Sequence, residues 1–232
     1  MKNIKVIVLD FDGVVISESE VFKKESWEHL FPHDSESGRA LQVAEARFGR
    51  GRGGDRFDIL RYVYKTIGTE DADIESRVAE GAEVFDDFVQ RRIIETGITA
   101  QNRHVIEGLK NKGYRIYLNS ATPLEAMRRT VENLRITDLF DGVLGRPHSK
   151  VQNLLLIARR EQVQPDEILF VGDSPSDLKA AREFGCEFVA VQNQGDLVWE
   201  KEGATSVSEL AAVLPVLGLT LGHENTREWD LP

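Results

Sequence analysis

Cysteine and long hydrophobic runs are what this chain most lacks. A single cysteine, Cys186, occurs among 232 residues, so an intrachain disulfide is excluded and a reducing compartment is expected. Cys186 leads into an apolar run and has no basic neighbour in sequence, which predicts a buried, unreactive thiol. No apolar stretch reaches the ~18 residues that span a bilayer, and the first residues lead directly into an apolar strand rather than a cleavable signal. We therefore expect a cytoplasmic protein without a membrane partner.

Positive charge is also scarce. The chain has 29 Lys and Arg against 39 Asp and Glu, a net charge of −10. This balance disfavours nucleic acid as a partner, because binding its backbone requires a basic surface. It does not disfavour a small phosphate ester, since a bound divalent cation and a few local cations invert the field within a site. With 41% hydrophobic residues, the chain can bury a core with or without an inserted second unit.

The most informative segment is residues 6–15, Val-Ile-Val-Leu-Asp-Phe-Asp-Gly-Val-Val. Its apolar run predicts a strand buried on both faces, as in a parallel sheet. Asp10 then lies at the carboxyl end of that strand, where open α/β sheets bind their ligands. Asp10 and Asp12 are two residues apart, so in extended backbone both side chains address one pocket.

Three later segments repeat this arrangement of polar residues beside an apolar run or a helix start. They are Asn-Ser-Ala-Thr-Pro at 119–123, Gly-Arg-Pro-His-Ser-Lys at 145–150 and Gly-Asp-Ser-Pro-Ser-Asp at 172–177. Together with residues 10–14, in this order, they resemble the haloacid dehalogenase superfamily of phosphohydrolases, over about residues 4–213. The resemblance implies an α/β fold: a Rossmann-like, doubly wound parallel sheet with an inserted α-helical cap domain.

The periodicity of the chain agrees with such an insertion. After Val15 apolar residues recur three and four apart, predicting four helices; they are expected at about 18–31, from Ser35 or Ser37 to 48, from Asp55 to 67, and from Asp71 or Asp73 to 95. From residue 100 helices and apolar strands alternate. Helices are expected at 100–112, 123–134, 149–162, 175–184 and 206–217, and strands at 114–119, 141–144, 168–172 and 187–191. The expected domains are a discontinuous core, residues 1–16 and 97–217, a cap, 17–96, and a polar C-terminal tail, 218–232.

Phosphate-ester hydrolysis requires a nucleophile, a proton donor and cations around the phosphoryl group. The resemblance implies that Asp10 is the nucleophile and forms an aspartyl-phosphate. Asp12 is then the general acid and base. Ser120, with the N–H of Ala121, holds a phosphoryl oxygen, and Lys150 offsets its charge. His148, near Lys150, is expected to be an ordinary loop histidine.

A metal is indicated by carboxylates without matching arginines. Asp173 and Asp177 lie one helical turn apart, and with Asp10 they favour a hard cation with oxygen ligands, Mg²⁺ being expected. The resemblance implies carboxylate ligation by Asp10 and Asp173 and backbone ligation by Asp12, with Asp177 acting through water or by orienting Lys150. The alternative is that Asp173 and Asp177 only cap a helix.

The segment 48–56 is rich in glycine and arginine. One interpretation is a substrate-specificity loop whose Arg50, Arg52 and Arg56 meet an anionic group of the substrate. The alternative is a solvated linker between two helices.

The sequence thus predicts a Mg²⁺-dependent phosphatase of a small phosphorylated metabolite, such as a sugar phosphate or a phosphoglycolate-like acid, acting as a monomer or homodimer. Asp12 argues against dehalogenase or phosphonate-cleaving relatives, which lack it. A phosphomutase of the β-phosphoglucomutase type stays open, although such relatives usually have Glu-Asp where this chain has Gly172-Asp173. A non-catalytic binding or regulatory protein of the same fold is the remaining alternative.

Overall fold

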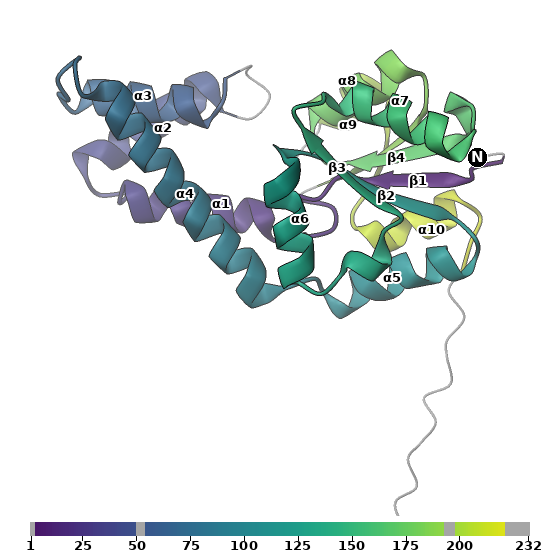
Figure 1. Ribbon diagram of the computed structural model, residues 1–232. Helices are drawn as coiled ribbons and strands as arrows, with labels where there is room; N and C mark the ends of the chain where they lie inside the picture. The colour runs from purple at the N-terminus through teal and green to yellow at the C-terminus, as the bar shows by residue number, and fades with distance from the viewer. Residues whose placement is uncertain (1–2, 50–53, 193–197, 221–232) are drawn as a thin grey trace, which may run out of the picture.

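The computed structural model describes residues 3–49, 54–192 and 198–220. Within these ranges the chain forms a parallel sheet of six strands in the order β3-β2-β1-β4-β5-β6 (Figure 1). The strands are β1 (Val6–Leu9), β2 (Arg115–Pro123), β3 (Gly142–Arg146), β4 (Ile168–Gly172), β5 (Glu187–Val191) and β6 (Thr205–Val207). The chain runs outward from the central β1 in both directions, so the sheet is doubly wound and the expected fold class is confirmed.

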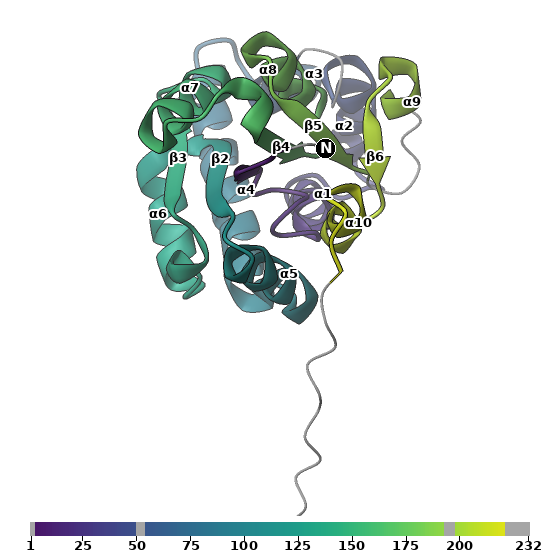
Figure 2. The same ribbon diagram turned by 90° about the vertical axis from the view of Figure 1, so that its right-hand side faces the viewer.

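Helices cover both faces of the sheet (Figure 2). One face carries α5 (Ala100–Asn111), α6 (Leu124–Asn133) and α10 (Val213–Val216), and the other carries α7 (Lys150–Glu161), α8 (Pro175–Phe184) and α9 (Val198–Glu202). The alternation of side chains along β1 explains the two layers: Ile7 and Leu9 join the first core, and Val6 and Val8 the second. None of the helices in the described ranges is long and apolar enough to cross a membrane.

The strand register aligns the carboxyl ends of the central strands. Leu9 pairs with Leu118 of β2 and with Val171 of β4, and the Asp10 N–H continues the ladder by donating to the Val171 carbonyl at 2.9 Å. The residues that follow these strands therefore meet at one edge of the sheet.

Four helices are inserted between β1 and α5, and we call residues 19–96 the helical insertion. They are α1 (Ser19–Leu30), α2 (Glu36–Phe48), α3 (Arg56–Thr66) and α4 (Ile74–Thr96). The Ser35 side chain caps α2, and Asp55 caps α3 in a capping box. The insertion lies beyond the carboxyl ends of the strands, and its boundaries agree with the predicted helices to within about three residues (Figure 1).

The prediction of one helix over 206–217 is wrong. Thr205–Val207 is strand β6, which pairs with β5, and only a 3₁₀ turn (Leu210–Ala212) and the single turn of α10 follow it. The apolar spacing of this segment is compatible with either structure. The edge of β5 favours the strand, because it offers backbone partners to residues 205–207, of which Thr205 and Val207 are β-branched.

Candidate active site

Three buried carboxylates lie together at the carboxyl edge of the sheet. Asp10 follows β1, Asp173 follows β4, and Asp177 lies in the first turn of α8; they are 5%, 5% and 0% exposed. Each presents an oxygen within 4.8 Å of the others. The strand register therefore brings together the three acidic residues that the sequence singled out.

Lys150 is the cation of this cluster. It is the first residue of α7, and its Nζ lies 2.9 Å from Oδ2 of Asp10 and 2.5 Å from Oδ1 of Asp177. Burial alone lowers the pKa of Lys150, but Asp10 and Asp177 outweigh it and leave the pKa above its ordinary value. Lys150 is therefore a permanent ammonium held against the cluster.

Both carboxylate oxygens of Asp177 accept hydrogen bonds from other residues of the chain. Its Oδ2 accepts from the backbone N–H of Ser174 at 3.1 Å and from the Ser174 hydroxyl at 2.5 Å, while Oδ1 meets Lys150. These contacts form the capping box of α8. The N-cap of α8 is Ser174 rather than Asp173 or Asp177, and Asp177 is the third residue of the helix, whose capping-box contacts also orient it toward Lys150.

Asp12 lies at the opening of the site rather than inside it. Its side chain is 28% exposed, and Oδ2 is 3.6 Å from Nζ of Lys23, which itself pairs with Glu20 at 2.7 Å. Burial lowers the pKa of Lys23, but Asp12 and Glu20 raise it above its ordinary value. Lys23 and Glu20 belong to α1, so the helical insertion contributes directly to the surroundings of Asp12.

Ser120 and Ala121 lie near the end of β2. Ser120 is buried, and its hydroxyl accepts from the Thr122 N–H at 3.1 Å. Both residues line a cavity of about 310 Å³ together with Asp10, Asp12, Asp173 and Lys150. The preceding Asn119 donates to the Lys150 carbonyl at 3.0 Å, which ties the end of β2 to the start of α7.

Two glycines allow the backbone to approach the carboxylates. Gly13 has a φ of +72°, and a Cβ there would lie 2.1 Å from Oδ2 of Asp173. At Gly172 a Cβ would lie 2.4 Å from Cβ of Asp177. Any larger residue at either position displaces one of the clustered carboxylates.

The charges of the cluster do not balance within the described residues. Burial raises the pKa of Asp10 well above its ordinary range, Asp177 raises it further, and Lys150 counters only part of this effect. Lys150 thus faces the three buried carboxylates, and Lys23, whose charge also acts on Asp173, is shared with Asp12 and Glu20. A divalent cation supplies the missing charge, and carboxylate oxygens are the ligands that Mg²⁺ prefers. The donor set therefore fits the metal: Asp10, Asp173 and Asp177 could each offer a carboxylate oxygen, and Asp177 is also held by Lys150 and Ser174.

Of the three arginines predicted to meet the substrate, the structure describes only Arg56. Arg50 and Arg52 lie outside the described residues. Arg56 lines a second cavity, of about 720 Å³, but its guanidinium pairs with Asp86 of α4 at 2.5 Å. A contact between Arg56 and substrate stays a prediction.

Other residues of the site carry no motif that would identify them. Lys23 and Glu20 lie within an ordinary amphipathic helix, and Arg146 ends β3. Their proximity to the motif residues depends on how the helical insertion lies over the sheet. The sequence offers one indication among these residues: Arg146 lies within segment 145–150, which carries Lys150. His148, in the same segment, is exposed.

Comparisons with known proteins concern the family and the fold. A family model described as "haloacid dehalogenase-like hydrolase" matches residues 4–185. A phosphoglycolate phosphatase of Salmonella typhi is 30% identical over 181 residues, which cover 71% of this chain and 69% of that protein.

Solved structures share the fold at lower identity. A "predicted phosphoglycolate phosphatase" of Haemophilus somnus has a TM-score of 0.67 and 19% identity, over 94% of this chain and 99% of that one. A β-phosphoglucomutase of Clostridium difficile has a TM-score of 0.58 and 19% identity, over 89% and 92%. At such identities the likeness concerns the fold alone.

Proposed function

The chain belongs to the haloacid dehalogenase-like hydrolase family, and on that premise we propose that it is a Mg²⁺-dependent phosphatase of a small phosphorylated metabolite. The observation that carries the proposal is the group formed by Asp10, Asp173, Asp177 and Lys150 at the carboxyl edge of the sheet. A phosphomonoester dianion needs cations around it and an ionised nucleophile at its phosphorus. The phosphatase relative supports the same reaction.

Asp10 is the proposed nucleophile. Its Oδ1 accepts the Phe11 N–H at 2.8 Å and its Oδ2 faces Lys150, so the carboxylate is held in one orientation. Attack on phosphorus forms an aspartyl-phosphate, and the alkoxide leaves. Mg²⁺, when bound by Asp10 and Asp173, supplies positive charge that keeps Asp10 ionised and neutralises the phosphoryl oxygens.

Asp12 is the proposed general acid and base. It protonates the leaving oxygen and then takes a proton from the water that hydrolyses the aspartyl-phosphate. Its position beside Lys23, at the opening towards the helical insertion, is suited to a leaving group on that side. Ser120 and the Ala121 N–H are proposed to hold a phosphoryl oxygen.

The helical insertion is the proposed cap. Glu20, Lys23 and Ala121 line both the 310 Å³ cavity at the carboxylates and the 720 Å³ cavity between the insertion and the core. Water exclusion by such a cover strengthens the electrostatic interactions within the site.

The phosphomutase alternative is disfavoured at Gly172. A glutamate there would place its Cβ 2.4 Å from that of Asp177, and Asp177 would have to leave Lys150. The fold likeness to a β-phosphoglucomutase does not distinguish the two activities.

The test is phosphate release from a panel of phosphomonoesters, phosphoglycolate included, with Mg²⁺ and after exhaustive chelation. We expect turnover with Mg²⁺, none after chelation, recovery when Mg²⁺ returns, and poor substitution by Ca²⁺, which prefers more ligands. Asp10→Asn is the matched control, expected to retain less than about a thousandth of the rate. Full activity after chelation, or in Asp10→Asn, would contradict the mechanism.

A further inference from the structure

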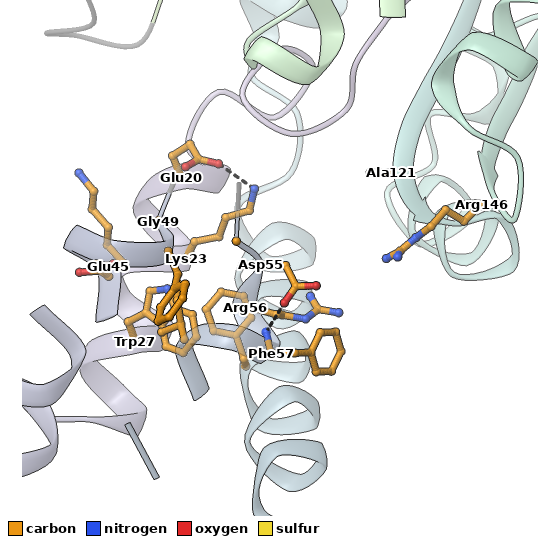
Figure 3. Close-up of a pocket in the computed structure, with 15 residues that line it drawn as sticks. Glu20, Lys23, Trp27, Glu45, Gly49, Asp55, Arg56, Phe57, Ala121 and Arg146 are labelled. Carbon is orange, nitrogen blue, oxygen red and sulfur yellow. Dashed lines mark hydrogen bonds and ion pairs between the residues drawn. The ribbon is translucent and has the colours of Figure 1, made fainter. Parts of the chain in front are cut away.

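The larger cavity separates the helical insertion from the core. Its volume is about 720 Å³; one side is formed by residues of α1 to α4, and the opposite side by Ala121 and Arg146 (Figure 3). It adjoins the carboxylate site, because Glu20, Lys23 and Ala121 line both cavities. It thus lies where the leaving portion of a phosphomonoester extends from the phosphoryl group.

The size of this cavity exceeds the need of a two-carbon acid. Pockets of about 300–1,000 Å³ hold ligands of drug size. Phosphoglycolate would occupy only a small part of such a volume. A leaving group larger than glycolate would fill more of this volume.

One side of the cavity is aromatic. Trp27, Phe48, Phe57 and Phe85 line it, and the Trp27 and Phe85 rings pack with their centroids 4.5 Å apart. Phe57 is 38% exposed, and its ring borders the cavity. Trp27 and Phe85 are themselves buried, so the rings that can contact a flat apolar group are those of the half-buried Phe48 and the exposed Phe57.

Among the described residues that line the cavity, two cations, Lys24 and Arg146, form no salt bridge, and most of the other charged groups are paired. Arg56 pairs with Asp86 at 2.5 Å, and Glu20 with Lys23 at 2.7 Å. Asp55 accepts the N–H groups of Phe57 and Asp58 as the cap of α3.

Arg146 forms no salt bridge with any residue in the described ranges, and its guanidinium extends from the core towards Arg56 and Phe57 (Figure 3). Burial raises the pKa of Asp86, and the positive charges of Arg56 and Arg146 oppose this rise. Arg146 thus adds a second guanidinium near the Arg56–Asp86 pair, on the core side of the cavity.

We infer that the cavity binds the leaving group of a phosphomonoester that combines a flat, apolar body with a carboxylate, and that Arg146 binds the carboxylate. The inference rests on the proposed phosphatase function and specifies its substrate class. A guanidinium offers a carboxylate two parallel hydrogen bonds. The aromatic side chains of the cavity pack against the apolar body of the leaving group. Arg146 is thus a specificity-determining residue contributed by the core.

Two synthetic esters test the carboxylate contact. They are the phosphate esters of 3-(4-hydroxyphenyl)propanoate and of 4-propylphenol, in which the saturated spacer keeps the two phenols similar as leaving groups. We expect wild-type kcat/KM to be roughly ten- to hundredfold higher for the carboxylate ester, the range of one charge-assisted contact. In Arg146→Gln the ratio of the two values is expected to fall to about one.

Two further variants distinguish loss of the Arg146 contact from a general loss of activity. Arg159→Gln removes an exposed arginine of α7 that lines none of these cavities, and the wild-type ratio is expected to persist. Phe57→Ala should lower kcat/KM for both aryl esters about tenfold more than for phosphoglycolate, because only the aryl esters reach the aromatic side. Equal ratios in wild type and Arg146→Gln would overturn the inference while leaving the phosphatase function intact.

A binding measurement keeps the two proposals distinguishable. If no phosphomonoester is hydrolysed, the proposed function fails, and calorimetric titration with 3-(4-hydroxyphenyl)propanoate decides the inference alone. Binding by wild type that weakens at least tenfold in Arg146→Gln supports it. No binding, or equal binding by both proteins, overturns it.

Discussion

At the residue scale, Lys150 contacts two of the three clustered carboxylates, and its side chain is only 11% exposed. Buried charges are tolerated when they are paired, and removal of one partner leaves the others uncompensated. Lys150 therefore contributes to the folded state, in addition to its proposed role in neutralising the phosphoryl group.

Lys150→Met removes that charge and keeps most of the side-chain volume. We expect a loss of about 3 kcal/mol in the free energy of unfolding, because Asp10 and Asp177 lose their ammonium partner. The rate should fall at least about a hundredfold. Denaturant unfolding and steady-state kinetics measure the two effects. Lys112→Met, at an exposed lysine after α5, is the control; an equal stability in both variants would contradict the role of Lys150.

Cys186 gives a pH-dependent prediction. Burial raises the pKa of its thiol from 9.0 to about 12, so at about pH 8 the folded protein holds far less thiolate than the unfolded chain. Iodoacetamide should modify the folded protein at least about a hundredfold more slowly than the protein in guanidinium. Since the chain has one cysteine, mass spectrometry follows this site alone. The sign for stability follows: the folded state keeps a proton that the unfolded state loses, so this contribution decreases above about pH 9. Equal labelling rates would contradict the raised pKa.

At the element scale, the loop after β1 is fixed to α5 and α1. Nδ2 of Asn102 lies 3.2 Å and 3.1 Å from the carbonyls of Val14 and Val15, and the Gly13 N–H donates to the Ser19 hydroxyl at 2.8 Å. This loop also carries Asp12. Its position relative to the sheet therefore depends on a few buried hydrogen bonds.

Asn102→Ala tests that connection. Two buried carbonyls lose their donor, and we expect a stability loss of about 1–3 kcal/mol. The rate should also fall, because Asp12 is no longer held at the opening of the site. Asn111→Ala, on the exposed end of the same helix, is the matched control, with a change within about 0.5 kcal/mol. If both variants unfold alike, the hydrogen bonds of Asn102 do not fix the loop.

The elements also show what the sequence can predict. Strand β4, helix α8 and strand β5 have the predicted bounds, because continuous apolar runs and a capping box mark them locally. Strand β6 has three residues and is stabilised by pairing with β5, which no local pattern reveals. The short α9 was missed as well; its Trp199 packs beside Leu178 of α8, a contact made only in the folded chain.

The candidate site divides in the same way. Asp10 and Asp173 follow recognisable strands and Asp177 lies in the first turn of a recognisable helix, and the parallel sheet brings such positions to one edge. Lys23 and Arg146 belong to the surroundings of the site through the packing of the helical insertion against the core. Asn119 and Asn153 are buried and joined by a hydrogen bond of 2.9 Å, and their role in holding α7 against β2 depends on tertiary structure. Motif spacing carries no information about these contacts.

At the scale of the whole molecule, the residues proposed for the chemistry and those proposed for the specificity occupy different parts of the chain. The sheet positions the carboxylates and Lys150, and the helical insertion supplies most of the residues that line the larger cavity (Figure 3). Arg146 and Ala121 are the exceptions, since they reach the cavity from the core. The account therefore predicts that substitutions in the insertion alter substrate preference more than they alter the covalent step.

The covalent step is the central claim, and trapping it is the most direct measurement. Asp12→Asn is mixed with Mg²⁺ and radiolabelled p-nitrophenyl phosphate, whose nitrophenolate leaves without a proton, and the reaction is quenched with acid. Because hydrolysis of the aspartyl-phosphate then lacks its base, the account predicts a label on the peptide that contains Asp10, released by hydroxylamine and absent from the Asp10→Asn protein. A label on another residue, or release of nitrophenol by Asp12→Asn with no labelled protein at any quench time, would contradict it.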